Sequence, residues 1–409
     1  MIFAGMIRLA AYSWLAKLTT ALCNFGTIVL LSRLLGVTER GVCAWYAVLI
    51  AISLLITDIA AGGTVVYLMQ QFGWRAMRKL YLFCAMGIGF AVTGAAFLLG
   101  SIQLVEAALL CVIAFFNAMF SFQNHVLLGL KQFRMFNIST SVAAFTLFAA
   151  TYFFLQSGTG RQGYLYAMLL VWSMASFAQH TLLQRISPYV DEPQTNQWAV
   201  LKKMVGTGFI NQLVQLLGLA NNRFPFFWMK AGMLGVFSNS LALAEAMMLL
   251  PGSIGQVYYS QHAGQEPGLK DYRRFARLMV ANAGLIAVAV VVIQLIPESF
   301  YTLLFGKGFN GVGAYLKLLS FSMLFYSMYM MLSYWQSAHG KFYINLYCTI
   351  LSLLTTCVFS LLFYVKDGWV LQNLVTAVAG GLVVSGVSAV VFFAAGWRAA
   401  AAGSKHKLR

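Results

Sequence analysis

The sequence predicts an all-α membrane protein with about 12 transmembrane helices, arranged as two pseudo-symmetric six-helix bundles. Hydrophobic residues make up 61% of the chain and charged residues 9%, and the mean hydropathy is +0.78. A soluble domain is about 25% charged and at most about half apolar, so this much apolar surface requires lipid as its solvent. The two other observations are a one-sided distribution of basic residues and a long polar segment near the middle of the chain.

Twelve apolar stretches are each long enough to span a membrane, because roughly 20 residues cross about 30 Å of hydrocarbon as a helix. Glycines mark several of the expected connections between them, namely Gly36, Gly73, Gly129 and Gly163. The expected helices lie near residues 10–35, 42–69, 80–100, 104–127, 135–156, 164–185, 202–230, 235–260, 276–297, 312–337, 342–364 and 370–396.

The basic residues predict the topology of these helices. With the N-terminus in the cytoplasm, 19 of the 27 Lys and Arg residues fall on the cytoplasmic side and six on the opposite side. Cytoplasmic loops carry such an excess of Lys and Arg, so we expect a multi-pass protein of the bacterial inner membrane with both termini in the cytoplasm. The net charge of +17 is therefore mainly a topology signal, with anionic lipid as a secondary partner and no nucleic acid expected.

The polar segment at 186–201 divides the chain into two halves of six helices each. We expect an N-terminal bundle at 1–190, a cytoplasmic linker at 191–201 and a C-terminal bundle at 202–409. A weak internal repeat supports two related halves: Gly41-Val42 opens a long apolar helix in the first, and Gly235-Val236 does so in the second. Two parallel bundles with a substrate path between them are a transporter architecture.

A polar stripe runs along the first expected helix at helical spacing. Such a stripe lines a wet cavity or packs against neighbouring helices through side-chain hydrogen bonds, and both interpretations stay open. Lys17 would need a partner or water, or would extend to the cytoplasmic surface. The stripe consists of Ser13, Lys17, Thr20, Asn24 and Thr27.

The seventh expected helix repeats this pattern with Asn211, Gln215 and Asn222. Arg223 follows, and Pro225 should kink the helix. A weaker stripe in the tenth helix starts at Lys317, and another in the fourth contains Ser121 and Asn124. A cation such as Arg223 inside the hydrocarbon costs at least ~2.5 kcal/mol if unpaired, so we expect it to bind substrate or to pair with an acid.

Two acids lie well inside the expected spans, Asp58 in the second helix and Glu245 in the eighth. Each could pair with Arg223 or Lys17, or carry a coupling proton, because burial raises the pKa of a carboxyl group towards neutrality. On the outer side we expect Glu39, Glu106, Glu298 and Asp367 to be isolated from one another.

The sequence lacks the motifs of several enzyme classes. It contains no P-loop for ATP hydrolysis and no His, Cys and Asp cluster with metal-ligand spacing, and no outer loop is long enough for a catalytic domain. We therefore expect a protein that is not an enzyme and binds neither a cofactor nor a metal.

Four motifs in order resemble those of the polysaccharide-repeat-unit flippases in the multidrug/oligosaccharidyl-lipid/polysaccharide exporter superfamily. Two positions depart from the family pattern, Val37 where the family has Pro and Pro225 where it has Asp. The matching segments are Ser32-Arg33-Leu34-Leu35-Gly36-Val37-Thr38-Glu39-Arg40-Gly41-Val42, Asp58-Ile59-Ala60-Ala61-Gly62-Gly63-Thr64, Asn222-Arg223 with Leu234-Gly235-Val236-Phe237, and Pro297-Glu298 with Leu304-Phe305-Gly306-Lys307-Gly308-Phe309.

The resemblance implies a flippase for an undecaprenyl-diphosphate-linked oligosaccharide, such as an O-antigen unit, that works by ion-coupled alternating access. It also implies a polysaccharide polymerase and a chain-length regulator as partners. Lys17, Arg223 and Arg33 would then counter the diphosphate, Asn24, Asn211, Gln215 and Asn222 would bond sugar hydroxyls, and Lys317 would also line the substrate path. Two alternatives remain: a drug or cation antiporter of the same superfamily, and a membrane-embedded polymerase or acyltransferase.

Overall fold

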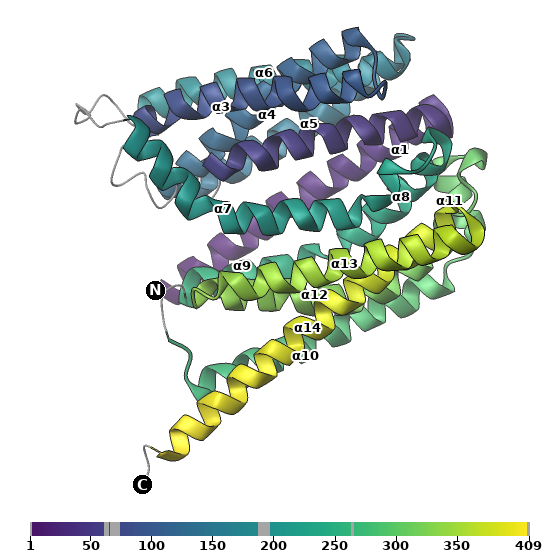
Figure 1. Cartoon of the computed structure of the whole chain (residues 1–409). Coiled ribbons are helices and arrows are strands. Elements are labelled where there is room, and N and C mark those ends of the chain that lie inside the picture. Colours follow the sequence, from purple (N-terminus) through teal and green to yellow (C-terminus); the bar gives the residue numbers. More distant parts are fainter. Residues whose placement is uncertain (1, 61–64, 66–73, 187–196, 263–265, 407–409) are drawn as a thin grey trace. The chain divides into compact units, whose positions relative to one another are not determined.

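The computed structural model describes residues 2–60, 65, 74–186, 197–262 and 266–406, and helices account for nearly all of them (Figure 1). The α-helices are α1 (Ile2–Thr57), α3 (Trp74–Leu98), α4 (Leu104–Gly129), α5 (Phe133–Gln156), α6 (Gly160–Ile186), α7 (Gln197–Asn222), α8 (Ala231–Ala246), α9 (Leu249–His262), α10 (Leu269–Leu295), α11 (Glu298–Phe305), α12 (Val312–Ala338), α13 (Phe342–Asp367) and α14 (Leu371–His406). Short 3₁₀ turns are η1 (Asp58–Ala60), η2 (Phe224–Phe227) and η3 (Lys307–Phe309).

The helix α1 contains a break at Gly36, where the sequence predicted a connection between two spans. Gly36 has φ 78° and ψ 178°, which is not helical. An L-residue with a side chain meets a steric clash at positive φ, whereas glycine adopts it freely. The two expected helices at 10–35 and 42–69 therefore exist as two segments of α1, and most of the final part, 61–69, lies outside the described residues.

Gly163, which the sequence placed in a connection, lies inside α6. Two expected helices are interrupted in the structure, and a proline explains each interruption. The span expected at 202–230 ends at Asn222 and continues as the turn η2, because Pro225 has no N–H to donate to a helix. The span expected at 235–260 is broken into α8 and α9, which meet at 45°. Pro251 lies in the first turn of α9, where its ring opposes the helical bond to the carbonyl of residue 247.

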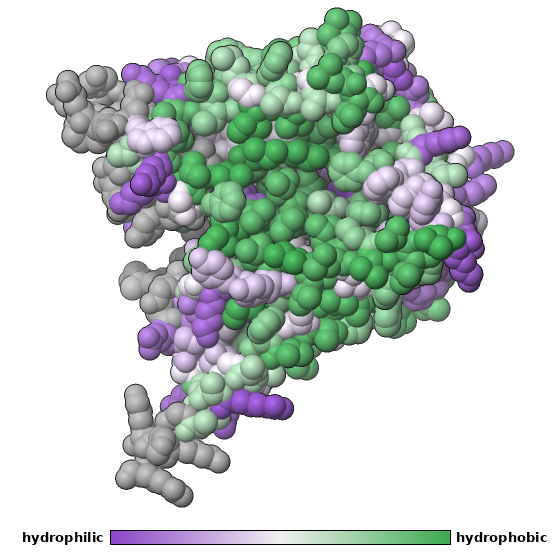
Figure 2. Space-filling model, viewed as in Figure 1, coloured by the Kyte–Doolittle hydropathy of each residue, from purple (hydrophilic) through white to green (hydrophobic). Residues whose placement is uncertain are grey.

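Eight helices of the described chain are long and apolar enough to cross a membrane, or nine if α8 and α9 form one bent span. The first of the eight, Leu15–Thr57, includes the break at Gly36. The helices α6 and α7 are also long enough but less apolar, so the full count of twelve crossings stays a prediction. Hydrophobic side chains cover the flanks of the helices in Figure 2, and hydrophilic ones gather near helix ends. This distribution is that of a membrane protein.

Two compact units make up the chain, unit 1 at Met1–Leu216 and unit 2 at Leu217–Arg409, so the change of unit occurs within α7. The predicted linker at 191–201 begins outside the described residues and ends in α7. The core of unit 1 includes Tyr46, Leu110 and Leu165 from α1, α4 and α6. In unit 2, Phe275, Trp335 and Phe393 bring together α10, α12 and α14.

Candidate functional site

The strongest predicted site residue, Arg223, is paired with Glu245 inside unit 2. Arg223 follows the last residue of α7, and Glu245 lies near the end of α8. The guanidinium makes two contacts with the carboxylate, Nη1 to Oε1 at 2.9 Å and Nη2 to Oε2 at 3.0 Å. This two-bond arrangement is the strong geometry for an arginine and a carboxylate. The sequence had left the partner of Arg223 open, and the structure assigns Glu245.

This ion pair is only partly buried, and a neighbouring amide oxygen has no hydrogen-bond partner among the described residues. The side chains of Arg223 and Glu245 are 21% and 37% exposed. Tyr326 on α12 lies beside the pair and interacts with both of its charges and with Asn222. Among the described residues, the buried Oδ1 of Asn222 has no hydrogen-bond partner. This oxygen is therefore available to accept a hydrogen bond from a hydroxyl group.

The end of α7 is held by a buried polar contact with α13 and α14. Thr356 donates to Oδ1 of Asn221 at 2.6 Å, and Ser352 donates to the carbonyl of Gly381 at 2.8 Å. A Cβ on Gly381 would collide with the hydroxyl of Thr356, so close helix packing requires glycine here. The contact fixes Asn221 directly before the candidate residues Asn222 and Arg223.

The second predicted cation of unit 2, Lys317, lies on α12 and is half-buried. Its backbone carbonyl accepts hydrogen bonds from Gln294 at 2.9 Å and from Ser320 at 2.8 Å. Gln294 also donates to the hydroxyl of Ser320 at 3.3 Å. This part of the predicted stripe therefore joins α10 to α12, which is helix packing.

In unit 1, the predicted acid Asp58 is buried, with 7% of its surface exposed. Tyr81 on α3 donates to its Oδ1 at 2.9 Å, and Ser121 on α4 donates to its Oδ2 at 3.4 Å. Hydroxyl donors stabilise a carboxylate and are also compatible with a protonated acid. These contacts are therefore compatible with both protonation states of Asp58.

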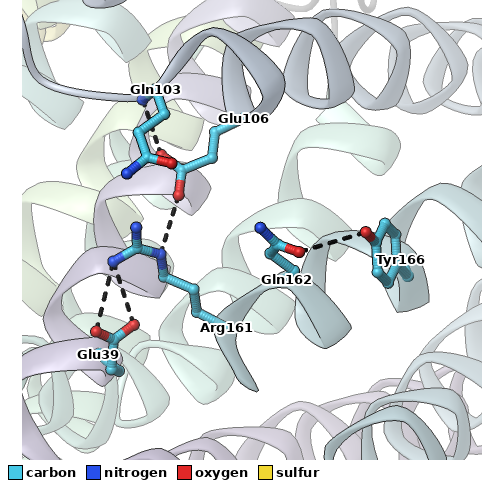
Figure 3. A network of polar contacts seen from close by, with 6 residues as sticks. All are labelled: Glu39, Gln103, Glu106, Arg161, Gln162 and Tyr166. Carbon is cyan, nitrogen blue, oxygen red and sulfur yellow. Dashed lines mark hydrogen bonds and ion pairs between the residues drawn. The ribbon is translucent and has the colours of Figure 1, made fainter. Parts of the chain in front are cut away.

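The acids Glu39 and Glu106 are not isolated, which corrects the sequence-based expectation. Arg161 at the start of α6 lies between them (Figure 3), with Nε 2.9 Å from Glu106 and Nη1 3.4 Å from Glu39. Glu106 is 3% exposed and also accepts the backbone N–H of Gln103 at 3.0 Å. We call Glu39, Glu106 and Arg161 the ion cluster. It ties the segment after Gly36 to α4 and α6.

The polar stripe of the first helix divides between helix packing and exposed positions. Thr20 lies 3.5 Å from the hydroxyl of Ser141 on α5, and Thr27 donates back to the carbonyl of Cys23. Lys17 is half-buried, whereas Asn24 is exposed. Thr20 therefore packs against a neighbouring helix rather than lining a cavity. The side chain of Ser13 lies outside the described part of the chain.

Three other predicted path residues are exposed in their own unit. Arg33 precedes the break in α1, and Asn211 and Gln215 lie on α7. Within unit 2, the structure therefore brings Asn222, Arg223 and Glu245 together in one place.

Several residues of these polar groups were not singled out by sequence. Tyr81 and Tyr326 look like ordinary aromatic residues of apolar helices in the sequence. Only the structure shows that their hydroxyl groups face polar side chains. Arg161 gave a signal, because an arginine near a span requires a counter-charge, but the sequence did not indicate which acid supplies it. Asn124, from the weak stripe in the fourth expected helix, lies at a helix interface, where it accepts hydrogen bonds from Gln179 at 2.8 Å and from Ser139 at 3.2 Å.

No group of three or more His, Cys, Asp and Glu side chains within the described part of the chain could hold a metal ion. The polar groups above contain amides, hydroxyls and ion pairs, which suit binding of polar or charged solutes. They do not form a nucleophile-and-base arrangement.

The sequence matches no protein-family model and no curated protein. Solved structures are nevertheless similar over almost the whole chain. An inward-facing multidrug resistance MATE family transporter of the MOP superfamily has a TM-score of 0.69 at 15% identity, covering 94% of this chain and 96% of that one. The outward-facing form has a TM-score of 0.63 at 14% identity, covering 96% and 95%.

A MOP superfamily transporter from Pyrococcus furiosus Vc1 has a TM-score of 0.63 at 17% identity, with coverage of 96% and 95%. That protein is described as having a binding pocket of reverse polarity, which suggests a different function for it. These similarities show that the chain has the fold of the MOP superfamily transporters.

Proposed function

We propose that this protein is a flippase that moves an undecaprenyl-diphosphate-linked oligosaccharide, such as an O-antigen or exopolysaccharide repeat unit, from the cytoplasmic to the periplasmic leaflet. It would do so by ion-coupled alternating access, as a multi-pass protein of the bacterial inner membrane. The observation that carries the proposal is the half-exposed group of Asn222, Arg223, Glu245 and Tyr326, which combines a guanidinium with hydrogen-bonding groups.

Charge is the main support for an anionic substrate. The predicted path and coupling residues include four cations, Lys17, Arg33, Arg223 and Lys317, and two acids, Asp58 and Glu245. A cation exporter should carry the opposite balance. An arginine binds phosphate with two parallel hydrogen bonds, as it binds Glu245 here, so a diphosphate could replace the carboxylate.

The fold supports a transport cycle. Related structures exist in inward-facing and outward-facing forms, each similar over at least 94% of this chain. The reversed pocket polarity of the Pyrococcus protein illustrates that charge in this fold varies with function. Asp58 is our candidate for ion coupling in unit 1, because two hydroxyls contact its buried carboxyl group. Glu245 is the candidate in unit 2, where substrate binding to Arg223 would release it to take up a proton.

The test is complementation of a deletion strain with a charge series. The gene is deleted in its own host, and wild type, Arg223→Gln, Arg223→Lys, Glu245→Gln and Asp58→Asn are restored at equal membrane levels. We expect deletion to abolish surface polysaccharide and to leave lipid-linked units facing the cytoplasm. Arg223→Gln should lose most export, Arg223→Lys should retain part of it, and Asp58→Asn should lose its dependence on the ion gradient.

Arg185→Gln is the matched control, because Arg185 is exposed at the end of α6. It should export like wild type. Normal export in the deletion strain would refute the flippase. Lipid-linked units already on the periplasmic face in the deletion strain would favour a polysaccharide enzyme. Drug sensitivity without a polysaccharide defect would favour the drug antiporter.

A further inference from the structure

Unit 2 contains a stack of three aromatic rings, none of which belongs to the Arg223–Glu245 pair. Trp228 follows the turn η2, Tyr364 lies in the last turn of α13, and Trp369 lies in the connection from α13 to α14. The centroids of Trp228 and Trp369 are 4.5 Å apart with planes at 16°, and those of Tyr364 and Trp369 are 4.5 Å apart at 30°. Trp369 is the middle ring of this aromatic stack.

The stack lies at a helix end and its outer rings are open. It is at the end of unit 2 where α13 passes into α14 (Figure 1). Trp228 is 47% exposed and Tyr364 is 45% exposed. Phe224 covers part of Trp228 at a tilted 43°, so the free face of Tyr364 and the edge of Trp228 are the accessible surfaces. Such flat apolar faces with polar edges suit a ligand that is apolar on one side and hydroxylated around its rim.

The polar residues beside the stack distinguish between possible ligands. Asp367 accepts a hydrogen bond from Asn373 at 3.1 Å, and both lie within a few residues of Trp369. Lys366 and Lys230 each lie two residues from a stacked ring along the chain. The lysines disfavour a cationic ligand, which would otherwise be the usual partner of an aromatic face. A carboxylate beside an amide suits neutral hydroxyl groups.

We propose that this aromatic stack is a carbohydrate-binding platform, on which a sugar ring packs its C–H face while Asp367 and Asn373 bond its hydroxyls. The choice of a glycan as ligand rests on the proposed function. The stack would be a second contact site for the glycan, besides the group around Arg223 and Glu245. Under the predicted topology the stack faces the periplasm, so it would hold the glycan after translocation. Aromatic stacking tolerates different sugars, which suits a carrier that recognises a repeat unit of several rings.

The test measures binding of free glycan to the purified protein in detergent by saturation-transfer NMR. The probe is an oligosaccharide released by mild acid from the surface polysaccharide of the host, so that it lacks lipid and diphosphate. Trp228→Leu and Tyr364→Leu should each weaken the apparent affinity about threefold to tenfold, the range for one aromatic contact. Trp228→Phe, which keeps a ring in the stack, should bind within about twofold of wild type.

Phe300→Leu is the matched control, because Phe300 is 49% exposed at the same end of unit 2 and lies outside the stack. It should bind like wild type. The platform is refuted if both leucine variants, with unchanged melting temperatures, bind as well as wild type, since the rings would then only anchor the helix end at the membrane interface. It is also refuted if wild type does not bind the glycan. Binding to the stack together with normal export in the deletion strain would support the platform and refute the flippase.

Discussion

The ion cluster of unit 1 and the ion pair of unit 2 use the same side-chain chemistry and differ in the burial of one carboxylate. Arg161 and Glu39 are 29% and 39% exposed, much like the two side chains of the pair in unit 2, but Glu106 is almost fully buried. In unit 1, Arg161 bridges Glu39 and a Glu106 that is 3% exposed, so three segments meet at one guanidinium. In unit 2, Arg223 has one carboxylate partner, and Glu245 is 37% exposed. The buried Glu106 must keep its counter-charge, whereas the Arg223–Glu245 pair keeps exposed surface through which a ligand can reach it. We therefore expect the ion cluster to stabilise unit 1, and we propose the pair in unit 2 as the one that exchanges with a ligand.

The largest expected effect comes from removing the shared cation of unit 1. Arg161→Gln should lower the free energy of unfolding by about 3 kcal/mol, because it leaves the buried Glu106 without its counter-charge. Denaturant unfolding of the purified protein in detergent measures this change.

Two controls make the Arg161 result specific. Arg185→Gln, at the exposed end of the same helix, should stay within about 0.5 kcal/mol of wild type. Adding Glu106→Gln to Arg161→Gln should restore part of the stability, because no unpaired charge remains buried. A loss for Arg161→Gln no larger than for Arg185→Gln would show that the ion cluster does not stabilise unit 1.

The break at Gly36 positions the ion cluster, since Glu39 follows it by three residues. Gly36→Ala should destabilise the protein by about 1–2 kcal/mol, because φ is 78° and the cost is steric strain in the backbone. No described atom lies within 4 Å of the position that the added methyl group would occupy, so crowding does not contribute. The same unfolding measurement applies.

Gly94→Ala is the matched substitution, since Gly94 lies within α3, has no atom within 4 Å of an added Cβ and lacks positive φ. It should raise stability by up to about 1 kcal/mol through better helix propensity. Equal effects of the two substitutions would contradict the backbone explanation.

The ion pair of unit 2 should contribute little to stability. Arg223→Gln and Glu245→Gln should each change the free energy of unfolding by at most about 1 kcal/mol, because both side chains of the pair are partly exposed. A loss near that of Arg161→Gln would instead make the pair structural and remove the contrast between the units.

The smallest expected effect concerns His339, which follows α12 at the opposite end of unit 2 from the aromatic stack. Burial lowers the pKa of His339 and outweighs the opposing hydrogen bond to the Trp335 carbonyl. Lys341 and His262 lower this pKa a little further, and Asp271 raises it least. The unfolded chain therefore binds a proton near pH 6.5 before the folded chain does, so stability falls as pH drops below about 6.5.

The measurement is the apparent melting temperature in detergent between about pH 7.5 and about pH 5. His339→Gln should reduce the acid-induced fall by a small amount, and it should melt like wild type at the upper pH. An unchanged acid-induced fall in His339→Gln would show that this histidine does not contribute to it.

The sequence by itself determined the membrane class, the helical content and most helix positions, because each depends on local composition. The length of an apolar stretch predicts a span, Gly36 permits the break in α1, and Pro225 ends a helix. None of these effects depends on the residues packed around them. Arg223, Asp58 and Glu245 were singled out as candidates because a charge inside an expected span requires a reason, but the structure places Arg223 directly after α7 and Asp58 in the turn η1, and their roles stay predictions.

Only the tertiary structure decided which charges meet. Glu39, Glu106 and Arg161 are up to 122 residues apart in the chain, and no local pattern connects them. The same holds for Tyr81 with Asp58, and for Thr20, whose place in a polar stripe turned out to serve packing against α5. Pairing depends on distance and burial, and both are properties of packed helices rather than of any one helix.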